Sequence, residues 1–151
     1  MKYRTTLGGA PQNQSDAANR TDSPAIASAA VSPLPFEVRK ETLDGGVEAI
    51  KVLGELDMNT APELERALEE AIADPDAAVM LDLCDCEFID STGIALIVRS
   101  WQRLDGGDGS QGRLVLCSHN HQVRRLLQIT GVESTISLHE RRDAALAELR
   151  A

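Results

Sequence analysis

Segments typical of strands and segments typical of helices alternate along this chain from residue 36 onward. Short apolar runs or two-residue alternation, the pattern of strands, occur at residues 36–40, 47–56, 79–83, 113–117 and 136–139. Apolar stripes of helical period follow in segments that start near residues 59, 93, 119 and 141. Strands that are joined by helices run parallel, because the helix returns the chain to the same end of the sheet. The pattern predicts an α/β fold with helices packed against a small, mixed and mostly parallel sheet, which opens with a hairpin at Asp44-Gly45-Gly46.

The core of this fold must be aliphatic, because apolar residues make up 42% of the chain and aromatic residues only 3%. The first helix, which Asn59 or Thr60 could cap and in which Pro62 lies early, carries one apolar stripe. That stripe consists of Leu64, Ala67, Leu68, Ala71 and Ile72. In the later helices the positions expected to face inward are Ile94, Leu96, Ile97, Val98, Val123, Leu126, Leu127, Ala144, Ala145 and Leu149.

The first 34 residues differ from the rest in composition. They are rich in Ala, Ser, Asn, Gln, Gly and Pro, and their apolar residues follow no period. Such a segment cannot bury enough apolar surface to offset the entropy of ordering it. We therefore predict a disordered tail over residues 1–34 and one folded domain over residues 35–151.

The charge balance excludes several classes of partner. Lys and Arg number 15 against 24 Asp and Glu, which gives a net charge of −9. Binding to nucleic acid or to an anionic membrane needs a basic face, so neither is expected. The chain also has no apolar run of the roughly 20 residues that span a membrane, and its start lacks the apolar stretch of a signal peptide. The three cysteines are odd in number and their spacing suggests no set of paired disulfides, which favours a reducing cytoplasm.

The motif Asp90-Ser91-Thr92-Gly93 lies where a strand is expected to turn into a helix. One interpretation is structural: an Asp, Ser or Thr side chain caps the helix, and Gly93 permits close packing. The other is functional: a hydroxyl is displayed at a helix N-terminus, where a phosphate would meet free N–H groups and a favourable dipole. A phosphoserine there would add nearly two negative charges to the surface.

A serine nucleophile is disfavoured at the same motif. The Gly-x-Ser-x-Gly pattern is absent because position 89 is Ile. The only possible histidine bases lie far along the chain, at positions 119, 121 and 139. The sequence predicts no catalytic residue and no enzymatic activity.

Two groups of side chains could hold a metal ion. The first is Cys84, Cys86, Cys117, His119 and His121. These residue types suit zinc, but their spacing fits none of the usual patterns, and cysteines next to strands are commonly buried as small apolar groups. The second is Asp57, Asp82, Asp85, Glu87 and Asp90, which could hold Mg²⁺ as in receiver-type phosphotransfer domains.

The receiver interpretation of the acidic group is the weaker one. A receiver needs a lysine at a strand end opposite the acids, and the only lysines here are Lys2, Lys40 and Lys51. Solvated loop charges, with Asp57 and Asp90 as helix caps, explain the group more simply. We therefore predict no bound metal.

Three blocks of this sequence together resemble the STAS domain of bacterial anti-sigma-factor antagonists. They are GELDMNTA at residues 54–61, VMLDL at residues 79–83 and FIDSTG at residues 88–93. Their order and spacing agree with the family, and the resemblance covers roughly Phe36 to Leu149. It implies a small mixed sheet with helices packed against it, as the periodicity also predicts.

The resemblance also implies a function and a site. In that family an anti-sigma factor with serine-kinase activity phosphorylates the serine of the Asp-Ser-x-Gly turn, which matches Ser91, with the neighbouring Thr92 as the alternative. The unphosphorylated protein would bind the anti-sigma factor and so free the sigma factor, and a serine phosphatase would reset the switch. The residues expected to contact the partner are Asp57, Thr60, Asp90, Ser91, Thr92 and Gly93.

No cofactor is expected in this chain itself. ATP and Mg²⁺ would belong to the partner kinase, because the sequence has no Gly-x4-Gly-Lys-Ser/Thr loop. The alternative function is a phospho-acceptor or small-ligand-binding α/β module, either receiver-like or part of a sensor complex of STAS proteins.

Overall fold

The computed structural model describes residues 35–104 and 112–150. Its elements are β2 (Glu37–Leu43), β3 (Val47–Leu56), α1 (Ala61–Ala71), β4 (Ala78–Ile89), α2 (Ser91–Leu104), β5 (Arg113–Cys117), α3 (His121–Ile129), the 3-10 turn η1 (Val132–Ser134), β6 (Leu138–His139) and α4 (Arg142–Arg150). The predicted tail and nearly all of the glycine-rich stretch before β5 lie outside the described residues. No helix in the described part is both long enough and apolar enough to cross a membrane.

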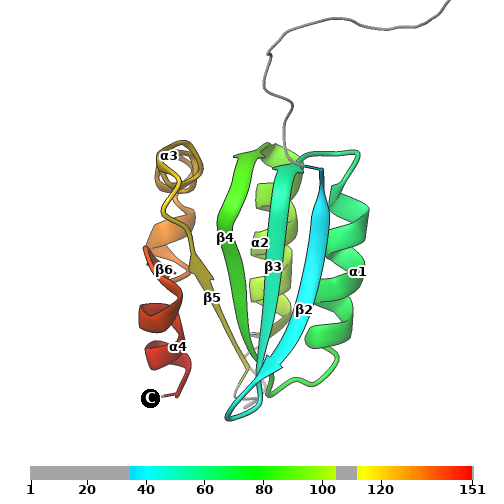
Figure 1. Ribbon diagram of the computed structural model, residues 1–151, viewed down its shortest axis with the longest axis vertical. Coiled ribbons are helices and arrows are strands. Elements are labelled where there is room, and N and C mark those ends of the chain that lie inside the picture. The colour runs from blue at the N-terminus through cyan, green and yellow to red at the C-terminus, as the bar shows by residue number, and fades with distance from the viewer. Residues whose placement is uncertain (1–34, 105–111, 151) are drawn as a thin grey trace, which may run out of the picture. The chain divides into compact units, whose positions relative to one another are not determined.

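The five strands form one sheet in the order β2-β3-β4-β5-β6 (Figure 1). Strands β2 and β3 pair antiparallel through a tight turn in which Gly45 and Gly46 have φ angles of 85° and 80°, a region that favours glycine. The other three pairs are parallel. The predicted α/β class with a mixed, mostly parallel sheet is confirmed.

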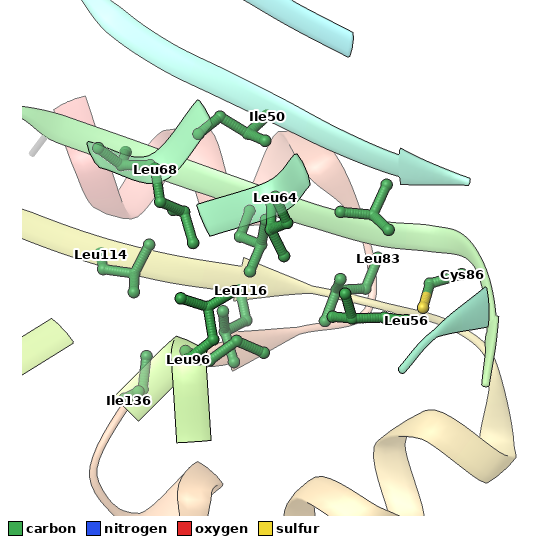
Figure 2. Packing of buried hydrophobic residues seen from close by; sticks show 14 of the residues in the cluster. Ile50, Leu56, Leu64, Leu68, Leu83, Cys86, Leu96, Leu114, Leu116 and Ile136 are labelled. Carbon is green, nitrogen blue, oxygen red and sulfur yellow. The ribbon is translucent and has the colours of Figure 1, made fainter. Parts of the chain in front are cut away.

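The larger part of the core lies on the face of the sheet that α1, α2 and α3 cover. Because side chains alternate along a strand, Val79, Leu81 and Leu83 of β4 all point to this face. Figure 2 shows Leu56, Leu83 and Cys86 gathered at one end of this cluster. The helices contribute chiefly Leu64, Leu68, Leu96, Ile97, Leu104, Val123 and Leu127.

Helix α4 covers the opposite face with a smaller cluster. Ala145 and Leu149 of α4 are buried against Met80, Val115 and Cys117, which are the alternate residues of β4 and β5, and against the start of β3. This face also buries the carboxylate of Asp82, to which Arg142 of α4 donates. The two clusters together account for the aliphatic core that the composition predicts.

Several predicted boundaries are corrected. Strand β4 runs on to Ile89 instead of ending at residue 83, because it stays paired with the long β3 through two register shifts up to Leu56 and Ile89. Helix α3 starts at His121, after Asn120 as its N-cap, and not at residue 119. The last strand is reduced from residues 136–139 to Leu138–His139, because only these two residues are in register with β5.

Some of the helix positions that we expected to face inward are only half-buried. Leu126 is one of them, whereas its neighbours Val123 and Leu127 are buried as predicted. Ile94 and Val98 pack at the margin of the core, while Leu96 and Ile97 lie inside it. The buried face of α2 and that of α3 are thus narrower than the apolar pattern of the sequence indicated.

Candidate functional site

Two turns meet at the edge of the sheet where β3 and β4 end. Leu56 is paired with Ile89 at the last register position, and the backbone N–H of Asp90 donates to the Leu56 carbonyl at 3.1 Å. Parallel strands end at the same edge, so the segments that follow them lie side by side. These segments are residues 57–60 and 90–93, which include all six of the expected partner-binding residues.

The first turn is held together by its own polar side chains. The Asp57 carboxylate accepts from the N–H groups of Asn59 and Thr60, at 2.9 and 3.1 Å through the same oxygen. The Thr60 hydroxyl donates to the Glu55 carbonyl at 2.8 Å and accepts from the N–H of Asp57 at 2.9 Å. Thr60 occupies the N-cap position of α1, but its side chain makes no capping hydrogen bond to the helix. Thr60 is thus the N-cap residue, as one of the two predicted candidates, but the expected capping bond from its side chain is absent: Asp57 supports the turn, and the Thr60 hydroxyl ties it back to β3.

The second turn is held by a similar pair of hydrogen bonds to an aspartate side chain. The Asp90 carboxylate accepts from the N–H groups of Thr92 and Gly93, at 2.9 and 3.2 Å through one oxygen. Asp90 is the residue before α2, so its side chain is the N-cap that the sequence left open between Asp90, Ser91 and Thr92. A cap of this kind also places negative charge at the favourable end of the helix dipole.

Ser91 and Thr92 are the first two residues of α2, and both are exposed. Within the described ranges, 35–104 and 112–150, neither hydroxyl takes part in a hydrogen bond. Both hydroxyls are therefore open to a partner, and the turn does not need either of them to hold its shape.

Gly93 brings this turn close to the two strand ends. It is buried, and a Cβ atom at this position would lie 2.8 Å from Cγ of Leu56 and 2.9 Å from Cγ1 of Ile89. Such distances are shorter than van der Waals contact allows, so a larger residue fits only if α2 or the Leu56 and Ile89 side chains move. The absence of a side chain at position 93 thus sets how deeply the start of α2, and with it Ser91, is seated on the sheet.

The residues that lie close enough to share a metal ion differ from the group that the sequence suggested. Asp82, Cys84 and Cys117 have ligand atoms within 4.8 Å of one another, on the face that α4 covers. Cys86 instead belongs to the large core on the other face, and burial raises the pKa of its thiol to about 11. His119 is exposed, so the five residues that the sequence suggested do not form one site.

The negative charge of Asp82 in this cluster is already balanced by the guanidinium of Arg142. Asp82 is 1% exposed and pairs with the Arg142 guanidinium at 2.5 Å, while the Cys84 N–H donates to its other oxygen at 2.9 Å. Burial alone would raise the pKa of Asp82, but these two partners hold that pKa below its ordinary value. Burial, with the nearby Asp82 charge, raises the pKa of the Cys84 and Cys117 thiols, whose sulfurs lie 4.0 Å apart. That the chain binds no metal stays a prediction.

The five acidic residues also do not converge on one site. Asp82 is buried under α4, and Asp85 pairs with Lys51 at 2.9 Å. Asp57 and Asp90 are committed to the two turns at the sheet edge. A receiver needs its acids together, so this arrangement disfavours the receiver interpretation.

Comparisons with known proteins agree with this fold. The family model of the STAS domain matches residues 40–145. The chain belongs to the STAS family. The family resemblance inferred from the three sequence blocks is thus confirmed.

Three relatives of this STAS protein are anti-sigma-factor antagonists by name. The anti-sigma-F factor antagonist RsfB of Mycobacterium tuberculosis is 28% identical over 105 residues, which are 70% of this chain and 83% of RsfB. The anti-sigma-B factor antagonist of Staphylococcus aureus is 32% identical over 91 residues, which are 60% of this chain and 82% of the relative. The crystal structure of an anti-sigma factor antagonist from Mycobacterium paratuberculosis is 31% identical, has a TM-score of 0.69, and the match covers 78% of this chain and 96% of that one.

Proposed function

We propose that this STAS protein is an anti-sigma-factor antagonist that phosphorylation at Ser91 switches off. In the unphosphorylated form it binds an anti-sigma factor with serine-kinase activity, and the sigma factor is released. The contact surface is the edge formed by the two turns, with Asp57, Thr60, Asp90, Ser91, Thr92 and Gly93. The relatives named as antagonists support the class of partner.

The observation that carries this proposal is the exposed Ser91 hydroxyl beside side chains that are already engaged. Asp57, Thr60 and Asp90 are engaged in hydrogen bonds that shape the turns. Ser91 can therefore gain a phosphate without any loss of internal hydrogen bonding. The phosphate would also lie at the N-terminus of α2, where the helix dipole favours negative charge. Phosphorylation changes the surface and leaves the fold intact.

The chemistry of the switch needs nothing from this chain beyond the hydroxyl. The kinase transfers the γ-phosphoryl group of ATP, so an Oγ–P bond forms at Ser91, ADP leaves, and the hydroxyl proton goes to a base on the kinase. A serine phosphatase hydrolyses the ester and restores the hydroxyl. The chain acts as substrate and ligand, in the cytoplasm where ATP and the sigma factor are present, and not as an enzyme.

The charge of one phosphate is sufficient for such a switch. A dianion buried in an interface without a counter-charge costs several kcal/mol, and here Asp57 and Asp90 add like charges nearby. A loss of about 1.4 kcal/mol already lowers affinity tenfold. Release upon phosphorylation therefore needs no conformational change in the fold.

The test is a capture experiment with three baits: the wild-type chain, Ser91→Ala and Ser91→Asp. We expect the wild type to capture an anti-sigma factor from native lysate and to release it when ATP is added. Ser91→Ala should keep it with or without ATP, and Ser91→Asp should bind it less well. Radiolabel from ATP should enter the wild type and the control Thr92→Ala only when the captured kinase is present. Label that persists in Ser91→Ala and is lost in Thr92→Ala would move the site to Thr92.

A further inference from the structure

A small apolar groove lies beside the Ser91 turn, between the end of β4 and helix α3. Its volume is about 170 Å³. The residues that line it are Glu87, Phe88, Ile89, Gln122, Val123 and Leu126. Ile89 and Val123 form its buried floor, so the groove opens directly onto the core.

Phe88 is the unusual residue of this groove. The chain has only two phenylalanines, yet the side chain of Phe88 is 46% exposed and belongs to neither core cluster. Leu126, across the groove on α3, was expected inside the core and is only half-buried. An aromatic ring and a leucine that the fold does not fully bury are typical of a surface that a partner covers.

We propose that this groove receives an apolar side chain of the anti-sigma factor, with a basic residue of that partner beside it. This inference rests on the proposed function and adds a second contact to it. Phe88 and Ile89 directly precede Asp90 and Ser91, so a protein that covers Ser91 extends over the groove without a break. The groove and the Ser91 turn thus form one continuous interface.

The charge of this edge indicates the chemistry of the partner. Glu87 lines the groove, and Glu55, Asp57 and Asp90 lie on the neighbouring turns and strand ends, in a chain with a net charge of −9. An apolar anchor flanked by Lys or Arg complements such a rim, while an acidic partner would be repelled. A buried apolar anchor inside a polar rim is also the usual anatomy of a binding hot spot.

The groove and Ser91 then have separate roles. The groove supplies affinity that is independent of phosphorylation, because it contains no modified residue. Ser91 supplies the charge that ends the interaction. A change in the groove should therefore weaken both binding and recognition by the kinase, and should leave the phosphoryl-transfer step itself intact.

The experiment uses the anti-sigma factor that is captured by the wild-type chain and identified by its ability to label Ser91. The variants are Phe88→Asp and Leu126→Asp, with Phe88→Ser as a milder change in case the charge disturbs folding. The matched control is Ile129→Asp, which places the same charge on an apolar residue that is 67% exposed on the same helix and does not line the groove. The Kd and the kinetics of Ser91 phosphorylation are measured, and thermal unfolding confirms that each variant is folded.

We expect the groove variants to raise the Kd and the KM about tenfold or more, with kcat within about twofold of the wild type. Ile129→Asp should change the Kd and the KM by less than about twofold, since it lies outside the interface. Glu87→Arg should slow association, and more strongly at low salt, because it reverses a charge of the rim.

Three results would overturn the inference. If Phe88→Asp and Leu126→Asp bind like the wild type while Ser91→Asp binds worse, the groove is not part of the interface and the proposed function stands. If the wild type neither binds nor becomes labelled, the proposed function fails and the inference fails with it. If the purified chain self-associates and the groove variants abolish only that self-association, the groove joins two copies of this chain and not the anti-sigma factor.

Discussion

The two turns at the edge of the sheet, residues 57–60 and 90–93, have the same backbone support and different uses for their hydroxyl groups. Each begins with an aspartate whose carboxylate accepts from the N–H groups two and three residues later. At the fourth position the first turn has Thr60, whose hydroxyl makes hydrogen bonds to the turn and to β3. The second turn has Gly93 there, and its hydroxyls, at Ser91 and Thr92, are free within the described part of the chain.

This difference shows how a turn can carry a modification without risk to the fold. In the first turn a hydroxyl is part of the scaffold, so its loss or modification would break hydrogen bonds. In the second turn the Asp90 carboxylate and the close packing of Gly93 hold the backbone, which leaves Ser91 free. We expect substitutions to expose this division.

Loss of the partner of the buried Asp82 carboxylate should destabilise the fold more than any change at Asp57 or Asp90, the aspartates of the two turns. Arg142→Met should lower the free energy of unfolding by about 3 kcal/mol, because it removes the cation from a carboxylate that is 1% exposed. Urea denaturation at pH 7 measures this loss. Neither Asp57 nor Asp90 is buried to this degree, so changes at the turns should cost less.

The pH dependence of this variant separates charge from packing. In the wild type the pKa of Asp82 lies below its ordinary value of 3.8, so its stabilising effect is present above that pH and is lost as the pH falls through the lowered pKa. In Arg142→Met the pKa of Asp82 should rise, since burial then acts with less opposition. The stability difference from the wild type should therefore shrink between pH 7 and pH 4. An equal deficit at both values would mean that the packing of the Arg142 side chain, and not its charge, is what is lost.

Gly93→Ala tests whether close packing positions the second turn. The added methyl would lie within 2.9 Å of Leu56 and Ile89 side-chain atoms, so we expect a loss of about 2 kcal/mol in urea denaturation. Ser91→Thr adds a methyl to the exposed side of the same turn and should change stability by less than about 0.5 kcal/mol. Equal effects of the two changes would contradict the assigned role of Gly93.

The sequence predicted the order of the elements and the sheet type because both follow from local periodicity. It could not show how far β4 extends, since Asp82, Cys84 and Asp85 interrupt the apolar pattern that marks a strand. The polar residues belong there because one face of β4 lies under α4 and carries the pairs to Arg142 and Lys51. Such partners come from distant parts of the chain and depend on the tertiary fold.

The site was predictable to a similar extent. The motif at residues 90–93 indicated a capped helix start with an exposed hydroxyl, and the structure contains one. The role of Thr60 was missed because its partners, the Glu55 carbonyl and the Asp57 N–H, are brought to it only by the folded turn. The groove at Phe88 was also missed: its other wall is α3, and no local pattern places α3 beside β4.

Alanine at the aspartate of either turn should have a similar, moderate effect. Asp57→Ala and Asp90→Ala each remove an acceptor for two backbone N–H groups, so each should lower the free energy of unfolding by about 1 kcal/mol. Asp57→Asn and Asp90→Asn keep an acceptor oxygen and should stay close to the wild type in the same urea titration. If only one aspartate matters, the two turns do not share the same support.

The smallest effects distinguish the two hydroxyl groups most directly. Thr60→Val keeps the shape of the side chain but removes a hydroxyl that donates to the Glu55 carbonyl and accepts from the Asp57 N–H, so it should cost about 1 kcal/mol. Ser91→Ala removes a hydroxyl with no described partner, so it should change the free energy of unfolding by less than about 0.5 kcal/mol. Yet Ser91→Ala should lose all labelling by the kinase, whereas Thr60→Val should still be labelled. A Ser91→Ala protein that unfolds as readily as Thr60→Val would show that the Ser91 hydroxyl supports the turn, and the contrast between a structural and a free hydroxyl would no longer hold.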